Sequence, residues 1–258
     1  MAALTLEFLG TGTSQGVPVI ACACRVCTSS DARDVRLRSA GLIKVDGRAL
    51  LIDAGPDLRA QMLRSRVASL DAVLLTHEHM DHVGGIDELR SFNFSQGCAM
   101  DIHGLPRTLD AVRNMFHYAF KADRYPGTPV LDLHPVEDAP FEVAGVAVTP
   151  VPVAHQDLPV LGYRVGGLAY ITDAKTIDDR AMDRLQGLDV LVLNALRIQP
   201  HPSHLNLEEA LALAGRIGAA RTYFTHISHL LGLHAEVQGL LPSGMQLAYD
   251  GLVVTASA

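Results

Sequence analysis

The sequence predicts one α/β domain in which two sheets pack face to face and helices cover their outer sides. Its 258 residues fit one large domain better than two small ones, and no linker rich in Ser, Pro or Gly divides them. Hydrophobic residues make up 48% and charged residues 19%, so the chain can bury a full core. Short apolar runs fall into two groups, and helical periodicity follows each group.

The individual elements follow from this rhythm of apolar runs and turn residues. Strands are expected at residues 4–9, 42–45, 49–52, 72–75, 143–150, 161–165, 168–172, 190–193, 221–224 and 247–249. Apolar residues at helical spacing predict helices at 58–67, 105–116, 177–186 and 207–217. The last helix has Glu208 and Glu209 in its first turn, where carboxylates interact favourably with the helix dipole.

Residues 91–140 differ from the rest of the chain. They contain close to half of its Phe and Tyr residues and show no clear strand rhythm. We expect an insertion that could cover a substrate site, although an aromatic cluster more often belongs to the core. The whole chain, residues 1–258, is otherwise expected to form a single domain.

Charge and hydropathy exclude several classes of protein. No run approaches the roughly 18 apolar residues of a membrane helix, and residues 1–12 have no basic region before their apolar residues. We therefore expect a cytoplasmic protein without a membrane partner. The net charge of -7 argues against broad binding to long nucleic acid or anionic lipid, although that count omits any bound metal.

The segment from Thr76 to His82 concentrates potential metal ligands. It follows an expected strand, so its side chains lie on a turn at a sheet edge, where loops commonly carry function. Four ligands within six residues can contact two metal ions less than ~4 Å apart: His77, His79, Asp81 and His82. The first two would bind one ion and the last two the other. A solvated polar turn explains one His, but this many His and Asp side chains are costly to bury without metal or partners.

Two pairs of ligands cannot complete two coordination shells, and polar residues at other strand ends supply more. His155, Asp173 and His226 each follow an expected strand, and a rigid sheet holds such residues in place. Asp173 is the best candidate to bridge two ions, because it is the sole carboxylate of the three. Taken singly, each residue could instead be a capping or hydrogen-bonded residue.

The cysteines indicate a second metal site. Cys22, Cys24 and Cys27 lie within six residues, too close for a mutual disulfide network. A closed tetrahedral site needs a fourth ligand, for which we favour His229 over His234; reduced free thiols in a loop are the alternative. Cys98 stands far from the others and is expected to be a small buried hydrophobic residue.

These motifs resemble a known family. The pattern His77-x-His79-x-Asp81-His82, followed by the three strand-end ligands, is typical of the metallo-β-lactamase superfamily. Residues 8–18, the Cys cluster and residues 51–55, 225–229 and 241–244 resemble its PhnP-like phosphodiesterases. The resemblance covers residues 4–251 and implies an αβ/βα sandwich of two mixed sheets with helices on the outer faces.

The resemblance also implies how the ligands are divided. One divalent ion would bind His77, His79 and His155. The other would bind Asp81, His82 and His226, with Asp173 bridging the two. The ions would share a hydroxide, because metal binding lowers the pKa of water from about 15.7 toward about 7. Zn and Mn both suit these ligands. The same resemblance implies one structural zinc on the three cysteines and His229.

Three other features complete the predicted site. We favour His204 as the proton donor to the leaving group, because it lies near the start of a helix; His201 is the second choice. We predict that Asp81 is also a catalytic residue, together with His204. Residues 10–14 predict a tight turn rather than a phosphate loop, because no Lys-Ser/Thr follows them. Asp53 is expected either to orient a ligand His or to be an ordinary strand-end carboxylate.

Together these features predict a metal-dependent hydrolase, and the resemblance narrows this to a phosphodiesterase acting on small cyclic or nucleotide-like phosphodiesters. Two divalent ions with Asp81 and Asp173 would make the centre positive, so an acidic chain can bind a small anion there. The alternatives are a tRNA 3′-end endonuclease, which the net charge disfavours, a thioester or lactam hydrolase, and a non-catalytic metal-binding module. We also allow for a homodimer.

Overall fold

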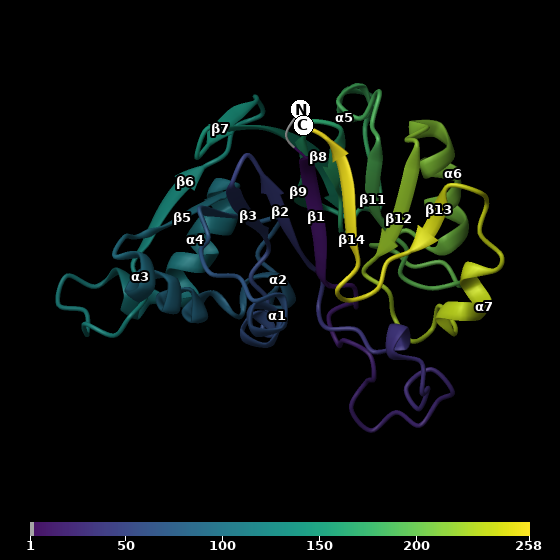
Figure 1. The fold of residues 1–258 in the computed structure, drawn as a ribbon, viewed down its shortest axis with the longest axis horizontal. Helices are drawn as coiled ribbons and strands as arrows, with labels where there is room; N and C mark the ends of the chain where they lie inside the picture. The colour runs from purple at the N-terminus through teal and green to yellow at the C-terminus, as the bar shows by residue number, and fades with distance from the viewer. Residues whose placement is uncertain (1–2) are drawn as a thin grey trace.

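Two seven-stranded sheets lie face to face in the computed structural model, which describes residues 3–258 (Figure 1). The first sheet contains, in spatial order, β14 (Val253–Ser257), β1 (Ala3–Gly10), β2 (Ala40–Val45), β3 (Arg48–Ile52), β4 (Ala72–Leu74), β5 (Met100–Gly104) and β6 (Leu131–Pro135). The second contains β13 (Met245–Leu247), β12 (Arg221–Thr225), β11 (Val190–Asn194), β10 (Leu168–Tyr170), β9 (Leu158–Val165), β8 (Val146–His155) and β7 (Phe141–Val143). The predicted sandwich of two mixed sheets is confirmed.

Each sheet is antiparallel at one side and parallel at the other. The strands from β14 to β3 are antiparallel neighbours, and those from β3 to β6 are parallel. The second sheet repeats this plan, antiparallel from β7 to β10 and parallel from β10 to β13. Parallel strands end at a common edge of their sheet, which brings residues distant in sequence together there.

Helices cover the outer faces of both sheets, as Figure 1 shows for α1 to α4 on one side and for α6 and α7 on the other. They are α1 (Leu58–Ser65), α2 (Met80–Val83), α3 (Arg90–Gln96), α4 (Pro106–Met115), α5 (Asp179–Asp183), α6 (Leu207–Ile217) and α7 (His234–Gln238), with 3-10 turns at Ala32–Asp34, Ile86–Leu89 and His117–Phe120. None of the described helices combines the length and apolarity needed to cross a bilayer. Met1 and Ala2, the start of the N-terminal stretch analysed above, lie outside the described residues.

Alternation along the strands divides the core into layers. In β3, Leu50 and Ile52 pack between the two sheets, whereas Leu51 faces the helical layer that contains Leu58 of α1 and Leu109 of α4. A third apolar layer lies between the second sheet and helices α5, α6 and α7. Because successive strand residues point to opposite faces, both faces of each sheet are buried against another layer.

The structure differs from the sequence prediction in several elements. Residues 91–140 supply β5, β6, α3 and α4, so this segment is built into the first sheet rather than added to it; a role in covering a substrate stays a prediction. The expected strand at 143–150 is the hairpin of β7 and β8, which turns at Ala144 and Gly145, both with positive φ. An uninterrupted apolar run concealed that turn. β14 was also not predicted, and α5 is shorter than expected.

Candidate metal centre

Strand ends from both sheets meet at one edge of the sandwich, where the predicted ligands lie. His155 is the last residue of β8, Asp173 lies three residues beyond β10, and His226 directly follows β12. Asp173 and His226 have φ values of 56° and 55°, in the left-handed region. Residues other than glycine rarely adopt this conformation, and such strained positions cluster at functional sites.

His77, His79 and His155 form one group of imidazoles. The backbone is extended at His79, with φ -64° and ψ 146°, so residues 77 and 79 point to the same side of the chain. Nε2 of His77 lies 2.9 Å from Nδ1 of His79, and the ring centroids of His79 and His155 are 5.3 Å apart. Nδ1 of His155 donates to the carbonyl oxygen of Ser203 at 2.7 Å, which leaves its Nε2 available to the cluster.

Asp81, His82, Asp173 and His226 form the second group. Nε2 of His82 lies 3.1 Å from Oδ2 of Asp81 and 3.3 Å from Oδ2 of Asp173. Nε2 of His226 lies 3.2 Å from Oδ1 of Asp173 and 3.6 Å from Oδ2 of Asp81. The two oxygens of Asp173 thus face different imidazoles, as the oxygens of a bridging carboxylate do. The structure brings all seven predicted ligands into one cluster.

Several buried nitrogens in this cluster make no hydrogen bond within the described part of the chain. They are Nε2 of His82 and both ring nitrogens of His226, whose side chains are completely or almost completely buried. A buried polar atom without a partner destabilises a protein. Within each of three groups the donor atoms lie within 4.8 Å of one another: His77, His82 and Asp173; Asp81, His82 and His226; and His155, Asp173 and His204. Imidazoles and carboxylates in such sets bind divalent cations, so these residues fit a metal centre, and His79 adjoins it through His77 and His155.

Asp53 holds one of these imidazoles in place. It follows β3 and is fully buried. Its Oδ2 accepts a hydrogen bond from Nδ1 of His82 at 2.6 Å, while Oδ1 accepts one from the backbone N–H of Thr76 at 2.8 Å. The Thr76 hydroxyl donates to Oδ2 at 2.9 Å. These bonds direct Nε2 of His82 toward the cluster, the role expected for Asp53 from the sequence.

Opposite charges outweigh burial in this cluster. Burial alone would favour neutral groups, but the neighbouring His226 and His82 hold the pKa of Asp173 well below its usual range. Conversely, burial opposes a charged His82, yet Asp173, Asp81 and Asp53 together raise its pKa well above the usual value. Burial lowers the pKa of His77, which therefore stays neutral. The three carboxylates around His82 thus favour a positive charge at this position, and a bound cation would supply it with the imidazole in the neutral form that binds metal.

His204 contacts the cluster directly, whereas His201 contacts His204. Nε2 of His204 is 3.0 Å from Oδ1 of Asp173, and its ring stacks on that of His226 with centroids 5.0 Å apart. Burial lowers the pKa of His204 to about 4. His201 reaches Asp173 only through His204, since its Nδ1 lies 3.2 Å from Nδ1 of His204. The geometry therefore favours His204 of the two proposed proton donors.

The three clustered cysteines converge on His229. Their Sγ atoms lie 3.4 Å (Cys22), 3.4 Å (Cys24) and 3.5 Å (Cys27) from its Nδ1. Hydrogen bonds from the backbone N–H of Cys27 and from His229 lower the pKa of Cys24 to about 6, whereas burial raises that of Cys27 to about 11. The set has the composition of a closed tetrahedral zinc site. In Figure 1 the segment between β1 and β2 that carries the cysteines projects from the sandwich beside α7.

Two residues considered with the cysteines lie elsewhere. His234 accepts a hydrogen bond from the buried guanidinium of Arg36, at 3.1 Å, and its backbone N–H donates to Asp34. His234 therefore holds the segment between β1 and β2 through Arg36 and Asp34 and is not one of the residues around the sulfur atoms. Cys98 is exposed, and the prediction that it is buried was wrong. Gly97, with φ 71°, ends α3 in a left-handed turn, and Cys98 lies in the loop that follows.

The glycine-rich segment after β1 forms β-bridges from Gly12 to Arg38 and Ile227 and turns only at Ser14 and Gln15, so the tight turn expected at residues 10–14 begins later than predicted. The backbone of Ile227 donates to the carbonyl of Thr11 at 2.9 Å and accepts from the N–H of Thr13 at 3.1 Å. A Cβ atom on Gly12 would lie only 2.9 Å from the carbonyl oxygen of Arg36, so this crossing requires glycine. This segment fixes the backbone immediately after His226.

Sequence comparison decides the family. The sequence profile of the β-lactamase superfamily domain matches residues 48–227. The chain belongs to the metallo-β-lactamase superfamily. A crystal structure described as a new diphosphatase from the PhnP family matches it with a TM-score of 0.91 and 41% sequence identity, covering 97% of both chains. The chain is thus a PhnP-like member of the metallo-β-lactamase superfamily, a fold family that depends on divalent metal ions.

Two curated relatives carry other names. The octanoyltransferase of Porphyromonas gingivalis is 44% identical over 247 residues, which are 95% of this chain but 50% of that protein. The ribonuclease Z of Bradyrhizobium diazoefficiens is 37% identical over 126 residues, 47% of this chain and 42% of that protein. The chain thus spans about half the length of these two curated relatives.

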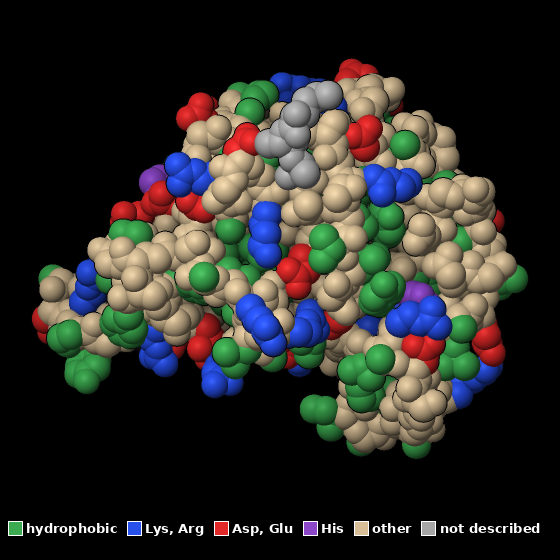
Figure 2. Space-filling model, in the orientation of Figure 1, with side chains coloured by type: hydrophobic (Ala, Val, Ile, Leu, Met, Phe, Trp, Pro, Cys, Tyr) green, Lys and Arg blue, Asp and Glu red, His purple; other side chains and the backbone are tan. Residues whose placement is uncertain are grey.

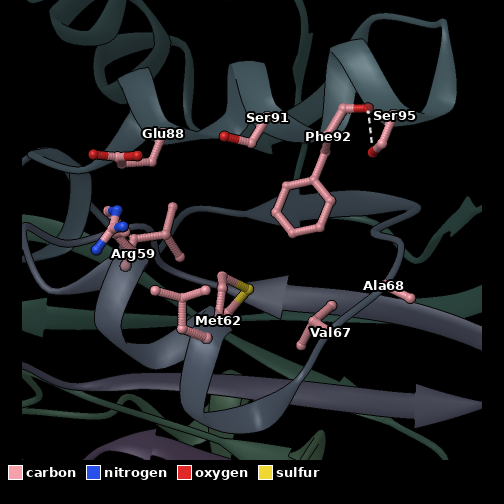
Figure 3. Close-up of a pocket in the computed structure, with 10 residues that line it drawn as sticks. Arg59, Met62, Val67, Ala68, Glu88, Ser91, Phe92 and Ser95 are labelled. Atoms are coloured by element: carbon pink, nitrogen blue, oxygen red, sulfur yellow. Dashed lines mark hydrogen bonds between the residues drawn. The ribbon is translucent and has the colours of Figure 1, made fainter.

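Two cavities differ in their relation to the metallo-β-lactamase site. One of about 370 Å³ lies between α1 and α3 in the outer helical layer, with Met62 and Phe92 on its apolar walls and Arg59 and Glu88 at one end (Figure 3). None of its ten lining residues belongs to the ligand cluster. Another, of about 340 Å³, opens directly onto candidate ligands and is lined by His79, His155, Gln156, Asp157, Leu158 and Ser203. Only the second of these two cavities adjoins the candidate ligands.

Several supporting residues could not be identified from the sequence. Thr76 binds Asp53, the carbonyl of Ser203 binds His155, and the hydroxyl of Thr172 donates to Asp173 at 2.6 Å. A lone Ser or Thr beside a motif carries no distinctive pattern. Gly55 is different, because a Cβ atom there would lie 2.0 Å from the carbonyl oxygen of Asp81. The residues around it were singled out only through the family resemblance.

Proposed function

We propose that this protein is a dinuclear metal-dependent phosphodiesterase acting on small cyclic or nucleotide-like phosphodiesters. The observation that carries the proposal is the cluster of seven nitrogen and oxygen ligands, in which the carboxylate of Asp173 lies between His82 and His226. Two adjacent cations suit a phosphodiester, because they neutralise charge on both the attacking and the leaving oxygen. The relationship to a PhnP-family protein described as a diphosphatase also supports chemistry at phosphorus.

In this proposal the chain binds three metal ions. His77, His79 and His155 would hold one ion of the active site. Asp81, His82 and His226 would hold the other, with Asp173 between them; either Zn or Mn suits this ligand set. When bound, the ions supply Lewis-acid activation of a water nucleophile near neutral pH. Cys22, Cys24, Cys27 and His229 would hold a structural zinc.

The residues of the chain then orient the substrate and move a proton. Burial lowers the pKa of His204 to about 4, so at pH 7 its ring is neutral and its N–H at Nε2 can donate a hydrogen bond to the leaving oxygen. To transfer a full proton the ring must first become imidazolium, a form that the carboxylate of Asp173, 3.0 Å away, and the negative charge of a bound phosphodiester both favour. The cavity of about 340 Å³ beside His79 and His155 offers space for the leaving group. Asp157 on its wall disfavours leaving groups that carry additional negative charge.

Hydrolysis of bis(p-nitrophenyl) phosphate by the purified protein tests the reaction class. We expect hydrolysis that stops on chelation and returns when Zn²⁺ or Mn²⁺ is added back. The same assay should then be repeated with a 2′,3′-cyclic nucleotide and with a diphosphate diester as substrates. Hydrolysis that survives complete chelation would contradict the metal mechanism. Turnover of acyl substrates without turnover of any phosphorus ester would favour a thioester or lactam hydrolase instead.

A tRNA 3′-end endonuclease is the second candidate, favoured by the relative named ribonuclease Z. The net charge of -7 opposes it, since binding a long polyanion requires an extended basic surface. On the face shown in Figure 2, Lys and Arg side chains are scattered in ones and twos among acidic and apolar residues. Cleavage of a precursor tRNA at a rate exceeding that of small phosphodiesters would establish this alternative.

A further inference from the structure

The extended segment that carries His77 and His79 has a back side, and Glu78 occupies it. Residues 77 and 79 face the metal cluster, so the side chain between them points the opposite way. There Oε1 of Glu78 accepts a hydrogen bond from Nε of Arg107 at 3.0 Å and lies 2.7 Å from Nη2 of the same guanidinium. Oε2 accepts one from the hydroxyl of Thr108 at 3.1 Å. Both carboxylate oxygens are therefore bonded to the first turn of α4.

The position of this contact on α4 strengthens it. Pro106 occupies the first turn, and the N-cap residue Leu105 makes no side-chain capping bond. The carboxylate of Glu78 brings a negative charge to this helix end, where the helix dipole favours it. Thr108 is fully buried, and the side chain of Glu78 is only 17% exposed. The side chain of Arg107 is 48% exposed, so the bond to Thr108 is the shielded part of the contact and the bond to Arg107 is the charge-assisted part.

A second ion pair on α4 shows what an ordinary surface contact looks like. Asp110 and Arg113 lie 3.1 Å apart, but their side chains are 71% and 54% exposed. Such pairs contribute little because water and salt screen them. The contact of Glu78 differs from this pair in its burial, in its three donor atoms and in joining two segments of the chain.

We propose that Glu78 is a positioning residue that sets the affinity of the metal centre by fixing the His77–His79 segment to α4. Anchoring the middle residue of an extended tripeptide fixes the directions of both flanking side chains. Glu78 is not placed to act as a general base, because its carboxylate points away from the cluster and binds Arg107 and Thr108. The inference concerns metal binding and holds for whichever reaction the centre catalyses, so it can fail separately from the proposed phosphodiesterase activity.

Glu78→Gln is the main test, because it keeps the size of the side chain and removes its charge. We expect the dissociation constant for Zn²⁺ or Mn²⁺, measured by chelator competition, to rise about 10–100-fold, the usual effect of losing a partner that orients ligands. The visible absorption of the Co²⁺-substituted protein should change, because the geometry of its imidazole ligands changes. With saturating metal, kcat should fall while KM stays nearly constant.

Asp110→Asn is the matched control, and it should leave metal affinity and the Co²⁺ spectrum unchanged. Thr108→Val removes one donor to Glu78 and should weaken metal binding less than Glu78→Gln, whereas Thr108→Ser should restore it. If Glu78→Gln does not fold, the two Thr108 variants serve as the test. Metal affinity and a Co²⁺ spectrum equal to the parent protein in both Glu78→Gln and Thr108→Val would overturn the proposal, whatever happens to thermal stability.

Discussion

The two candidate metal sites lie only three residues apart along one segment, yet they are built differently. His226 belongs to a cluster of buried side chains at the ends of strands, where Asp53, Thr172 and the carbonyl of Ser203 orient the ligands. His229 faces cysteines of intermediate exposure on a loop between β1 and β2. The first arrangement suits two ions with open positions for reaction, and the second suits one closed structural ion.

The difference shows where rigidity comes from in each site. The buried cluster takes it from the sheets, since His155, Asp173 and His226 lie on or just beyond strand ends, and from the short helix α2, which carries Asp81 and His82. The loop takes it from the sulfur cluster itself and from the buried Arg36, which bonds to His234, Thr11 and the carbonyl of Ala248. Loss of metal from the loop should therefore loosen the loop first and disturb His226 only indirectly.

The largest expected effect comes from Asp173→Ala in the buried cluster. The substitution removes the carboxylate that faces both His82 and His226. We expect kcat/KM to fall by at least about 10³-fold, corresponding to about 4 kcal/mol of lost transition-state stabilisation. Metal analysis should show loss from the active site with the structural zinc retained. Unchanged activity at normal metal content would refute the assigned bridging role.

His204→Ala should have the next largest effect, and it should depend on the leaving group. A substrate with an alkoxide leaving group should react about 10²–10⁴-fold more slowly, because that oxygen needs a proton. A p-nitrophenyl ester should be affected much less. His201→Ala serves as the control, since His201 lies behind His204. An equal loss for both leaving groups would argue for a binding role of His204 instead.

Cys24→Ser probes the loop and should affect stability more than catalysis. We expect one fewer zinc per chain and a fall in Tm of roughly 6–12 °C, if about 3 kcal/mol of stability is lost. The value of kcat should change only a few-fold, since the buried cluster keeps its ligands. Loss of all activity at full active-site metal content would show that the two sites are coupled more tightly than their construction suggests.

A pH titration should produce the smallest effect and involves histidines outside both sites. Burial lowers the pKa of His103 and of His234 to about 4. The unfolded chain protonates these groups near pH 6.5, so between about pH 6.5 and pH 4 it binds more protons than the folded protein. Stability should therefore fall as the pH drops through this range. His103→Phe should make the decline in Tm less steep, and an unchanged slope would contradict the assignment.

The sequence predicted the fold class and the candidate ligands, because strands and ligand motifs are each recognised from residues that lie close together along the chain. Short apolar runs between turn residues located strands such as β3, and the His77–His82 motif concentrates four ligands in six residues. β5 and β6 are not such runs, because each has only five residues in which polar side chains such as Asp101, His103 and His134 alternate with apolar ones. Tertiary pairing with β4 determines that these segments are strands.

The sequence by itself determined which side chains are available for metal binding and that two sets of ligands exist. Only the tertiary structure determined which residues meet: that Asp53 orients His82, that His229 rather than His234 faces the cysteines, and that Glu78 binds α4. These contacts join residues about 30 to more than 200 positions apart, and no local pattern encodes such a pairing. They depend on parallel strands that end at a common edge, a property of the assembled sheets.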